Sequence, residues 1–458
     1  MSQNMINKVY EDIDKNFEKY VKDLQAYLSQ PSISATGEGI EETAQMTAEY
    51  IKKLGSKDVR LVRFKDGHPI VYGTIMSKNA RRTLVLYNMY DVQPPEPLDE
   101  WISPPFAANI VDGKMIARGA VNTKGPVMGM FKGLESYLNV YGEFPVNLVF
   151  IIEGEEELGS PHIPEFVRMY EDDLKKCDAV YMHGNDQEED DTPAVHLGVK
   201  GLLYFEMEAE MGSRDVHGSL ATIVPNPVWK LVWVLKTMKD ESNRILIKGL
   251  YDDVRPPTSE EIEMVKDIAA RKDLQKFKEF LGVNEFRQDL KGLDLYIENY
   301  FKPTLNIDGI ISGYTGPGTK TLVPSKARVK MDIRLVPNMT SDKVWELVKN
   351  HMKEHGFNDI KLIKRSSYEW ARASPSSHIA KSVITSLKQL GYNPLIYPTL
   401  EGSAPFYIFS KPPLNLPFVL AGFAYGFLAH APNEYIKLTQ YRESMRLMAT
   451  ILENFKTF

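Results

Sequence analysis

Three adjacent carboxylates stand in the segment EGEEELGS, residues 153–160, directly after an apolar run. Glu155, Glu156 and Glu157 repel one another, and a fold tolerates such a group more easily when a cation or a proton-transfer role compensates the charge. A solvated acidic turn is the alternative, because runs of charge usually face water. The segment therefore predicts either a site for metal or acid–base chemistry or an exposed turn.

Two other segments offer polar side chains at tight turns. In ARGAVNTKG, residues 117–125, glycines bracket the turn and Asn122 presents an amide oxygen. In LAHAPNE, residues 428–434, His430 precedes a Pro-Asn turn after a buried strand. Taken singly, the first pattern is usually only a strand-to-helix turn. For the second pattern, the plainer explanation is a histidine that caps a helix. Neither segment identifies a ligand by itself.

His217 and Arg334 are candidates for binding negatively charged groups of a substrate. His217 stands beside Asp215 in SRDVHGS, and a loop histidine flanked by glycine and serine could donate to a developing oxyanion. Arg334 lies on the alternating segment KARVKMDIRLVP, so its guanidinium could face a cleft and bind a carboxylate in bidentate fashion. A solvated loop histidine and a surface ion pair are the plainer explanations.

Asp91 follows an apolar run in YNMYDVQPPEP, residues 87–97, and a proline turn fixes it at the end of a strand. Chemistry in α/β folds usually sits at this position. Met89 shares the strand face of Asp91, where a metal enzyme would need a histidine whose second ring nitrogen the carboxylate could hold. The segment is therefore either an altered metal site or no metal site.

Alternating strands and helices must position these side chains. Apolar runs such as HPIVYGTI, RTLVLYNMY, NLVFIIEGEEE and CDAVYMHG are separated by helical patterns, among them residues 124–141. Helices are also expected over 5–30 and 40–54. This alternation predicts an α/β fold with a mostly parallel sheet, and the polar ends of the strands should converge on one site.

The pattern changes at residue 201, where GLLYFEMEAEM alternates like a half-solvated strand. A proline-started helix follows, and a capping box at Thr258 and Glu261 opens a charged helix to about residue 280. The α/β pattern returns near residue 378. We therefore predict a catalytic α/β domain over 1–200 and 378–458, with an inserted α+β lid and dimerisation domain over 201–377.

Composition excludes several classes of protein. The 458 residues carry a net charge of −6, so nucleic acid is not an expected partner. One cysteine, Cys177, leaves no thiolate metal cage, so any metal must use histidines and carboxylates. No signal peptide or membrane-spanning run is recognisable, and a cytoplasmic protein without a membrane partner is expected.

In order and spacing, these segments resemble the dinuclear zinc amidohydrolase family of carnosinases, cytosolic non-specific dipeptidases, acetylornithine deacetylase and succinyl-diaminopimelate desuccinylase. The carnosinase-like branch is most similar, and the resemblance spans nearly the whole chain. It implies two metals in the catalytic domain and a lid that dimerises and lends a histidine to the partner's site. The motifs that carry it are YDVQP, PPF, RGA with KGP, EGEEELGS, GPGTKT, IRLVPNMT and HAPNE.

The resemblance also implies roles for single residues. They are Glu156 as general base, Asp91 as the carboxylate that supports the metal site, His217 as the lent histidine, Arg334 as the group that holds the substrate carboxylate, and Glu157 with His430 as ligands of the second metal. The family's substrate loop Gly-Gly-Ser-Ile-Pro appears here as EGSAP, 401–405. Gly402 and Ser403 are therefore expected to bind substrate, and Glu401 adds negative charge where the family has glycine.

The departures from the family pattern all concern the first metal. Its histidine, bridging aspartate and terminal carboxylate correspond to Met89, Asn122 and Gly184. His183 and Asp186 flank Gly184 and would rebuild a ligand only after a shift in register. The pattern predicts that one metal position is dismantled, while Asn122, Glu157 and His430 hold one remaining ion.

Two hypotheses follow from this pattern. In the first, the chain hydrolyses the amide bond of a small peptide or an N-acyl amino acid, using Glu156 and one divalent metal. Zinc is expected, with manganese and cobalt as alternatives. In the second, the chain is a catalytically inactive or metal-free relative that acts as a binding or assembly protein. One dication with a single carboxylate ligand has the same net charge as two dications with three carboxylate ligands, so we favour the first hypothesis. We also expect a homodimer formed through the lid.

Overall fold

The computed structural model describes residues 2–184, 187–188, 190–423 and 426–458. Its contacts divide the chain into two compact units. Unit 1 comprises Met1–Gly198, Arg372–Tyr397 and Ile408–Phe458. Unit 2 comprises Val199–Ala371 and Pro398–Tyr407. The chain passes from unit 1 to unit 2 at β9 (Gly198–Val199), returns at β16 (Ala371–Arg372), and enters unit 2 once more over Pro398–Tyr407.

Unit 1 is built on an eight-stranded sheet in the order β1-β2-β6-β3-β7-β18-β8-β17. The neighbours β6, β3, β7 and β18 pair in parallel, as do β8 and β17. The predicted α/β fold with a mostly parallel sheet is confirmed, and its apolar runs form the buried centre. The strands are β1 (Asp58–Val62), β2 (Ile70–Ile75), β3 (Thr83–Met89), β6 (Asn147–Glu153), β7 (Ala179–His183), β8 (Ala194–His196), β17 (Leu395–Tyr397) and β18 (Phe418–Ala421), with β4 (Asn109–Val111), β5 (Lys114–Ile116), β19 (Gly426–Phe427) and β20 (Tyr435–Lys437) in a smaller sheet.

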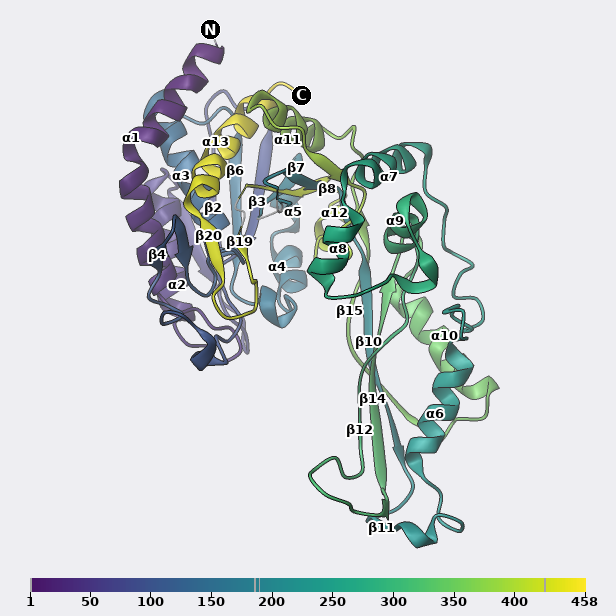
Figure 1. Ribbon diagram of the computed structural model, residues 1–458. Helices are drawn as coiled ribbons and strands as arrows, with labels where there is room; N and C mark the ends of the chain where they lie inside the picture. The colour runs from purple at the N-terminus through teal and green to yellow at the C-terminus, as the bar shows by residue number, and fades with distance from the viewer. Residues whose placement is uncertain (1, 185–186, 189, 424–425) are drawn as a thin grey trace. The chain divides into compact units, whose positions relative to one another are not determined.

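Three helices of unit 1, α1, α3 and α13, pack against one another (Figure 1). Two glycines one helical turn apart on α3 permit the close approach of α13. A Cβ on Gly129 would lie 2.1 Å from Ser444 Oγ, and a Cβ on Gly133 would lie 2.5 Å from the backbone oxygen of Met445. The helices are α1 (Ser2–Ser29), α2 (Ile40–Lys53), α3 (Lys124–Tyr141), α4 (Ile163–Met169), α5 (Glu171–Leu174), α11 (His378–Gln389), α12 (Tyr407–Ser410) and α13 (Leu438–Phe455).

Unit 2 is built on a four-stranded antiparallel sheet in the order β12-β14-β10-β15. Helices α6 and α10 pack on this sheet (Figure 1), and Phe205, Val234 and Val329 are fully buried in its core. The predicted α+β character of the insertion is therefore confirmed. Its elements are β10 (Gly201–Glu210), β11 (Val216–His217), α6 (Pro227–Met238), α7 (Ser259–Arg271), α8 (Leu274–Leu281), α9 (Gly292–Phe301), β12 (Asn306–Ser312), β13 (Leu322–Val323), β14 (Lys326–Leu335), α10 (Ser341–Glu354) and β15 (Lys361–Tyr368).

The charged helix predicted to run to about residue 280 is two helices, α7 and α8. The capping box at Thr258 and Glu261 is present at the start of α7. Asp273 accepts hydrogen bonds from the backbone N–H groups of Gln275 and Lys276, so it caps α8 and separates it from α7. None of the described helices is both long and apolar enough to cross a bilayer.

The contact between α3 and α13 yields a prediction about stability. We expect Gly133→Ala to lower the free energy of unfolding by about 1–3 kcal/mol, because the new methyl group meets the backbone of Met445, which cannot rotate away. Urea unfolding followed by circular dichroism measures the change. Gly309→Ala is the control, since its Cβ meets nothing within 4 Å and should change stability by no more than about 0.5 kcal/mol. Equal stabilities of the two variants would contradict this account of the contact.

Candidate active site

Asp91 fixes the acidic segment at the carboxyl ends of β3 and β6. Its buried carboxylate accepts hydrogen bonds from the backbone N–H groups of Glu156, at 3.2 Å, and of Glu157, at 3.0 Å. These two residues begin a short 3-10 helix, Glu156–Leu158, whose first N–H groups need such an acceptor. Burial, followed by the charge of Glu157, raises the pKa of Asp91 to about 7. Asp91 therefore orients the turn and does not enter the cluster described below.

The acidic segment is not a solvated turn. Glu153 is buried and accepts hydrogen bonds from the hydroxyl groups of Tyr87 and Ser160. Glu155 is also buried and pairs with Nδ1 of His162 at 2.6 Å. Because Glu153 and Glu155 each have hydrogen-bonding partners of their own, the repulsion between the neighbouring carboxylates is offset.

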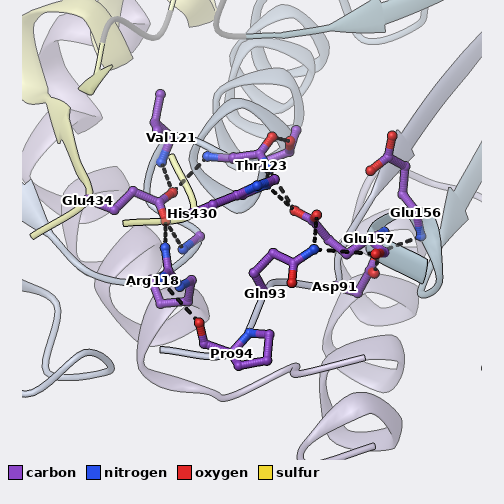
Figure 2. Close-up of polar contacts among 12 residues, drawn as sticks. Asp91, Gln93, Pro94, Arg118, Val121, Thr123, Glu156, Glu157, His430 and Glu434 are labelled. Atoms are coloured by element: carbon purple, nitrogen blue, oxygen red, sulfur yellow. Dashed lines mark hydrogen bonds and ion pairs between the residues drawn. The ribbon is translucent and has the colours of Figure 1, made fainter. Parts of the chain in front are cut away.

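Glu156 differs from its neighbours in having no hydrogen-bond partner for its carboxylate among the described residues. Figure 2 shows its carboxylate apart from that of Glu157, and the drawn bond of Glu156 comes from its backbone nitrogen. Burial raises the pKa of Glu156 to about 8, and the charges of Glu157 and Asp91 add to the effect. A half-buried carboxylate with unsatisfied oxygens is suited to accept a proton.

Asn122, Glu157 and His430 lie within hydrogen-bond distance of one another, and Figure 2 shows His430 and Glu157 of this group. The Asn122 Nδ2 atom donates to Glu157 Oε1 at 2.7 Å and lies 2.8 Å from His430 Nε2, and His430 Nε2 lies 3.0 Å from Glu157 Oε1. The second oxygen of Glu157 accepts a hydrogen bond from Gln93 Nε2 at 2.8 Å. His430 has a left-handed backbone with φ 63°, an uncommon conformation that clusters at functional sites.

A buried ion pair builds the turn that carries Asn122. Glu434 and Arg118 are both almost fully buried and lie 2.7 Å apart. The Glu434 carboxylate also accepts the backbone N–H groups of Gly119, Val121 and Asn122 at 2.9–3.1 Å. This one carboxylate satisfies the donors of the glycine turn and the charge of Arg118, as a buried ion pair requires.

Gln93 and Glu434 were not among the residues predicted for the site. Both lie in segments singled out from the sequence, YDVQP and HAPNE, but nothing in their local pattern reveals a partner in the folded chain. Gln93 meets Glu157 across 64 residues, and Glu434 meets Arg118 across 316 residues. Only the fold brings these partners together.

The resemblance to the family implies that Met89, Asn122 and Gly184 stand where the first metal is held, and none of them offers a histidine or a carboxylate. Met89 is buried at the end of β3 and offers a thioether, which is a poor zinc ligand. Gly184 packs against Gly422 so closely that a Cβ on Gly422 would lie 1.8 Å from the Gly184 oxygen. Asn122 replaces the bridging carboxylate. Two dications with this set of side chains would not be neutralised, so the residues do not fit a dinuclear site.

His183 does not rebuild the missing ligand in this structure. Its Nδ1 atom lies 3.0 Å from the hydroxyl group of Tyr181, and burial lowers the pKa of His183 to about 3. The ring is therefore neutral and packed beside Tyr181 rather than in the cluster of Asn122, Glu157 and His430. Asp186, the other candidate, lies outside the described residues.

The remaining side chains fit one divalent cation. A carboxylate oxygen and an imidazole nitrogen, from Glu157 and His430, are ordinary ligands of zinc. Asn122 directs its amide nitrogen at both of them, while its oxygen accepts a hydrogen bond from Thr123 Oγ1 at 2.9 Å. A half-turn of the amide exchanges the nitrogen and the oxygen, which supplies the third donor.

Arg334, Gly402 and Ser403 belong to unit 2 and lie close together there. Arg334 NH1 donates to Ser403 Oγ at 2.8 Å, and its Nε lies 3.3 Å from Asp332 Oδ2. Among the described residues, NH2 of this guanidinium has no hydrogen-bond partner. The structure thus brings the two predicted substrate-binding segments together, although they are 69 residues apart.

His217 lies in β11 of unit 2 and is exposed. Its Nδ1 atom lies 2.8 Å from Ser219 Oγ and accepts the Ser219 backbone N–H at 3.2 Å, which leaves Nε2 facing Thr321 Oγ1 at 3.4 Å. Asp215 turns away and binds Ser325. His217 is thus fixed in orientation by its own loop.

The Arg118–Glu434 pair yields a prediction. Glu434→Gln leaves the buried guanidinium without its counter-charge, so we expect the free energy of unfolding to fall by about 3 kcal/mol or more. Thermal and urea unfolding measure the loss. Glu100→Gln removes an exposed carboxylate from the loop near Asn433 and should change stability by about 0.5 kcal/mol at most. A Glu434→Gln variant as stable as the wild type would show that the pair does not hold the turn.

Comparison with known proteins agrees with this architecture. The S. pombe (Schizosaccharomyces pombe) protein "Cys-Gly metallodipeptidase dug1" is 30% identical over 467 residues, which covers 97% of each chain. The Homo sapiens protein "Beta-Ala-His dipeptidase" is 30% identical over 366 residues, 76% of this chain and 72% of the relative. The crystal structure of the M20 family metallo-carboxypeptidase Sso-CP2 from Sulfolobus solfataricus has a TM-score of 0.90 and 38% identity, covering 96% of this chain and 99% of that chain.

A family-wide comparison gives the same result. The sequence model described as "Peptidase family M20/M25/M40" matches residues 85–454, a range that holds Asp91, Asn122, Glu157 and His430. The resemblance predicted from the motifs is therefore confirmed. This chain belongs to the peptidase family M20/M25/M40.

Proposed function

We propose that this chain hydrolyses the amide bond of a small peptide or an N-acyl amino acid with one divalent cation, zinc, held by Asn122, Glu157 and His430. The observation that carries the proposal is the convergence of these three side chains within 3.0 Å of one another, beside the Glu156 carboxylate, for which the described part of the chain offers no hydrogen-bond partner. The names of the relatives, two metallo- or dipeptidases and a metallo-carboxypeptidase, support the reaction class.

The chain's own residues divide the work of amide hydrolysis. Gln93 holds one oxygen of Glu157 so that the other faces His430 and Asn122. A divalent cation bound there supplies the Lewis acidity that polarises the scissile carbonyl. Asp91 holds the backbone of Glu156, and the Glu156 carboxylate takes a proton from the attacking water and returns it to the leaving amine.

Unit 2 is proposed to bind the substrate. Arg334 has its Nε and NH1 atoms anchored by Asp332 and Ser403, so the guanidinium is pre-oriented for a substrate carboxylate. Gly402 is proposed to let the backbone of the same loop approach the substrate, because it has no side chain in the way. His217 is proposed to donate to the developing oxyanion of a partner subunit's substrate.

Substitution of the general base tests the reaction. We expect Glu156→Gln to lower kcat by about 10²-fold or more, because glutamine cannot accept the proton, while the zinc content of the protein stays the same. Steady-state hydrolysis of a dipeptide panel and elemental analysis give the two readouts. Glu155→Gln, in the same turn, keeps a hydrogen-bonding group for His162 and should retain activity. Unchanged turnover of Glu156→Gln would remove Glu156 from the mechanism.

One observation favours a second candidate, a non-catalytic binding protein. Asn122 donates a hydrogen bond to Glu157, His430 lies within hydrogen-bond distance of both, and the hydrogen bond between His430 and Glu157 raises the pKa of His430. A protonated His430 would pair with Glu157 without any metal. Chelator-sensitive hydrolysis by the purified chain excludes this candidate, and a chain that binds dipeptides without hydrolysing them would favour it.

We further propose a homodimer formed through unit 2. Helix α6 exposes Trp229, Val232 and Trp233, which lie on one face at helical spacing, and the two indole rings stack at 6.4 Å. Leu220 and Ile223, just before the helix, are exposed as well. Aromatic residues in an exposed apolar group are typical of interfaces, and His217 precedes this group closely in sequence.

Negative charge introduced into the exposed apolar face of α6 tests the proposed dimer. Glutamate in place of both Trp229 and Trp233 should convert the protein to monomers, because two carboxylates cannot be buried in an apolar interface. Light scattering after size-exclusion chromatography measures the mass. Met76→Glu, at a 70% exposed residue of unit 1, is the control and should leave the mass unchanged. A wild-type chain that is monomeric at micromolar concentration would contradict the proposal.

A further inference from the structure

The loop over residues 398–407 is clamped to unit 2 at its base. Leu400 forms an isolated bridge with Val199, and the backbone N–H of Lys200 lies 3.3 Å from the Leu400 oxygen and 3.0 Å from the Gly402 oxygen. One donor thus holds the carbonyl groups on both sides of Glu401. The Arg334–Ser403 bond at 2.8 Å adds a third point of attachment. The segment around Glu401 is therefore fixed to the strand that carries Arg334.

Glu401 keeps its charge uncompensated within this loop. Its Oε1 atom accepts a hydrogen bond from Asn299 Nδ2 at 2.9 Å, and Asn299 is neutral. No lysine or arginine among the described residues pairs with Glu401, and the side chain is exposed. Arg334, by contrast, has Asp332 beside its Nε. The loop holds an oriented carboxylate whose counter-charge unit 2 does not supply.

The two charged groups lie within reach of a single amino-acid residue of a substrate. Glu401 and Ser403 are two residues apart, which spans about 7 Å at most, and Ser403 touches the guanidinium of Arg334. A substrate carboxylate bound by Arg334 would lie within about two residue lengths of the Glu401 backbone, so the side chain of the same substrate residue could reach Glu401. A lysine side chain carries its ammonium on a flexible four-carbon stem and can cover such a separation.

We propose that Glu401 is a specificity-determining residue that selects peptides with a cationic C-terminal residue, lysine or arginine. The inference rests on the proposed function, because it takes Arg334 as the group that binds the C-terminal carboxylate. Asn299 orients the Glu401 carboxylate, and the substrate side chain supplies the missing positive charge. A peptide with an acidic C-terminal residue is repelled by the same group.

A matched series of dipeptides tests the proposal. Ala-Lys, Ala-norleucine and Ala-Glu share an N-terminal residue and differ in the charge of the second side chain. With the zinc-loaded full chain, kcat/KM for Ala-Lys should exceed that for Ala-norleucine by about fivefold, the upper range for an exposed ion pair. In Glu401→Gln this ratio should fall to about one, with Ala-norleucine changed by less than about twofold. Added salt should reduce the wild-type ratio.

The control is Glu279→Gln. Glu279 is an exposed carboxylate of unit 2 that also accepts a hydrogen bond from a neutral amide, Gln275 Nε2, at 3.1 Å. This variant should keep the wild-type preference for Ala-Lys. If the ratio of kcat/KM for Ala-Lys to kcat/KM for Ala-norleucine is the same in the wild type and in Glu401→Gln, the proposal is overturned, while the hydrolase function stays intact.

Calorimetry separates the two proposals if no peptide is hydrolysed. The absence of hydrolysis contradicts the proposed function. The uncleaved Ala-Lys and Ala-norleucine then serve as ligands in the calorimeter. Tighter binding of Ala-Lys that is lost in Glu401→Gln supports the selective role of Glu401 without any turnover. Equal affinities of the two peptides for the wild-type chain overturn it.

Discussion

Mutual repulsion among carboxylates is the constraint around which the site is built. Asp91, Glu153, Glu155, Glu156 and Glu157 all lie at the carboxyl ends of β3 and β6. Each of the first three has its own neutral or cationic partners, so the charges are separated and screened. The backbone of the turn is held by Asp91. We propose that the two remaining carboxylates serve proton transfer, in Glu156, and the binding of a cation, in Glu157.

The replacement of the first metal's ligands, which the resemblance implies, removes the positive charge of a metal and the negative charge of its carboxylates together. A methionine, an asparagine and a glycine stand where the family pattern has a histidine and two carboxylates. Removing a dication without removing its carboxylates would leave the turn strongly negative, whereas here both are lost together. The Arg118–Glu434 pair supports the turn that carries Asn122, and Gln93 holds Glu157. This joint loss is the reason why we propose a single-ion site.

Local sequence patterns were sufficient for much of the fold, whereas the three residues of the cluster were selected through the resemblance to the family, because neither of their turns identifies a ligand by itself. The helix over 124–141 was predicted at its observed bounds, because its glycine turn and apolar spacing are local signals. The break between α7 and α8 was missed because Asp273 acts as a cap in a helix-like run of charges. The roles of Gln93 and Glu434 were missed for a different reason. Their partners are distant in sequence, and only tertiary packing brings them together.

The metal content of the purified chain tests the central claim most directly. After incubation with zinc and removal of free metal, elemental analysis should find about one ion per chain, and Glu157→Gln and His430→Ala should each lose it. The same measurement on Asn122→Asp should retain the ion, because a carboxylate replaces the amide donor. Two ions per wild-type chain, or none at saturating zinc, would contradict the single-cation account.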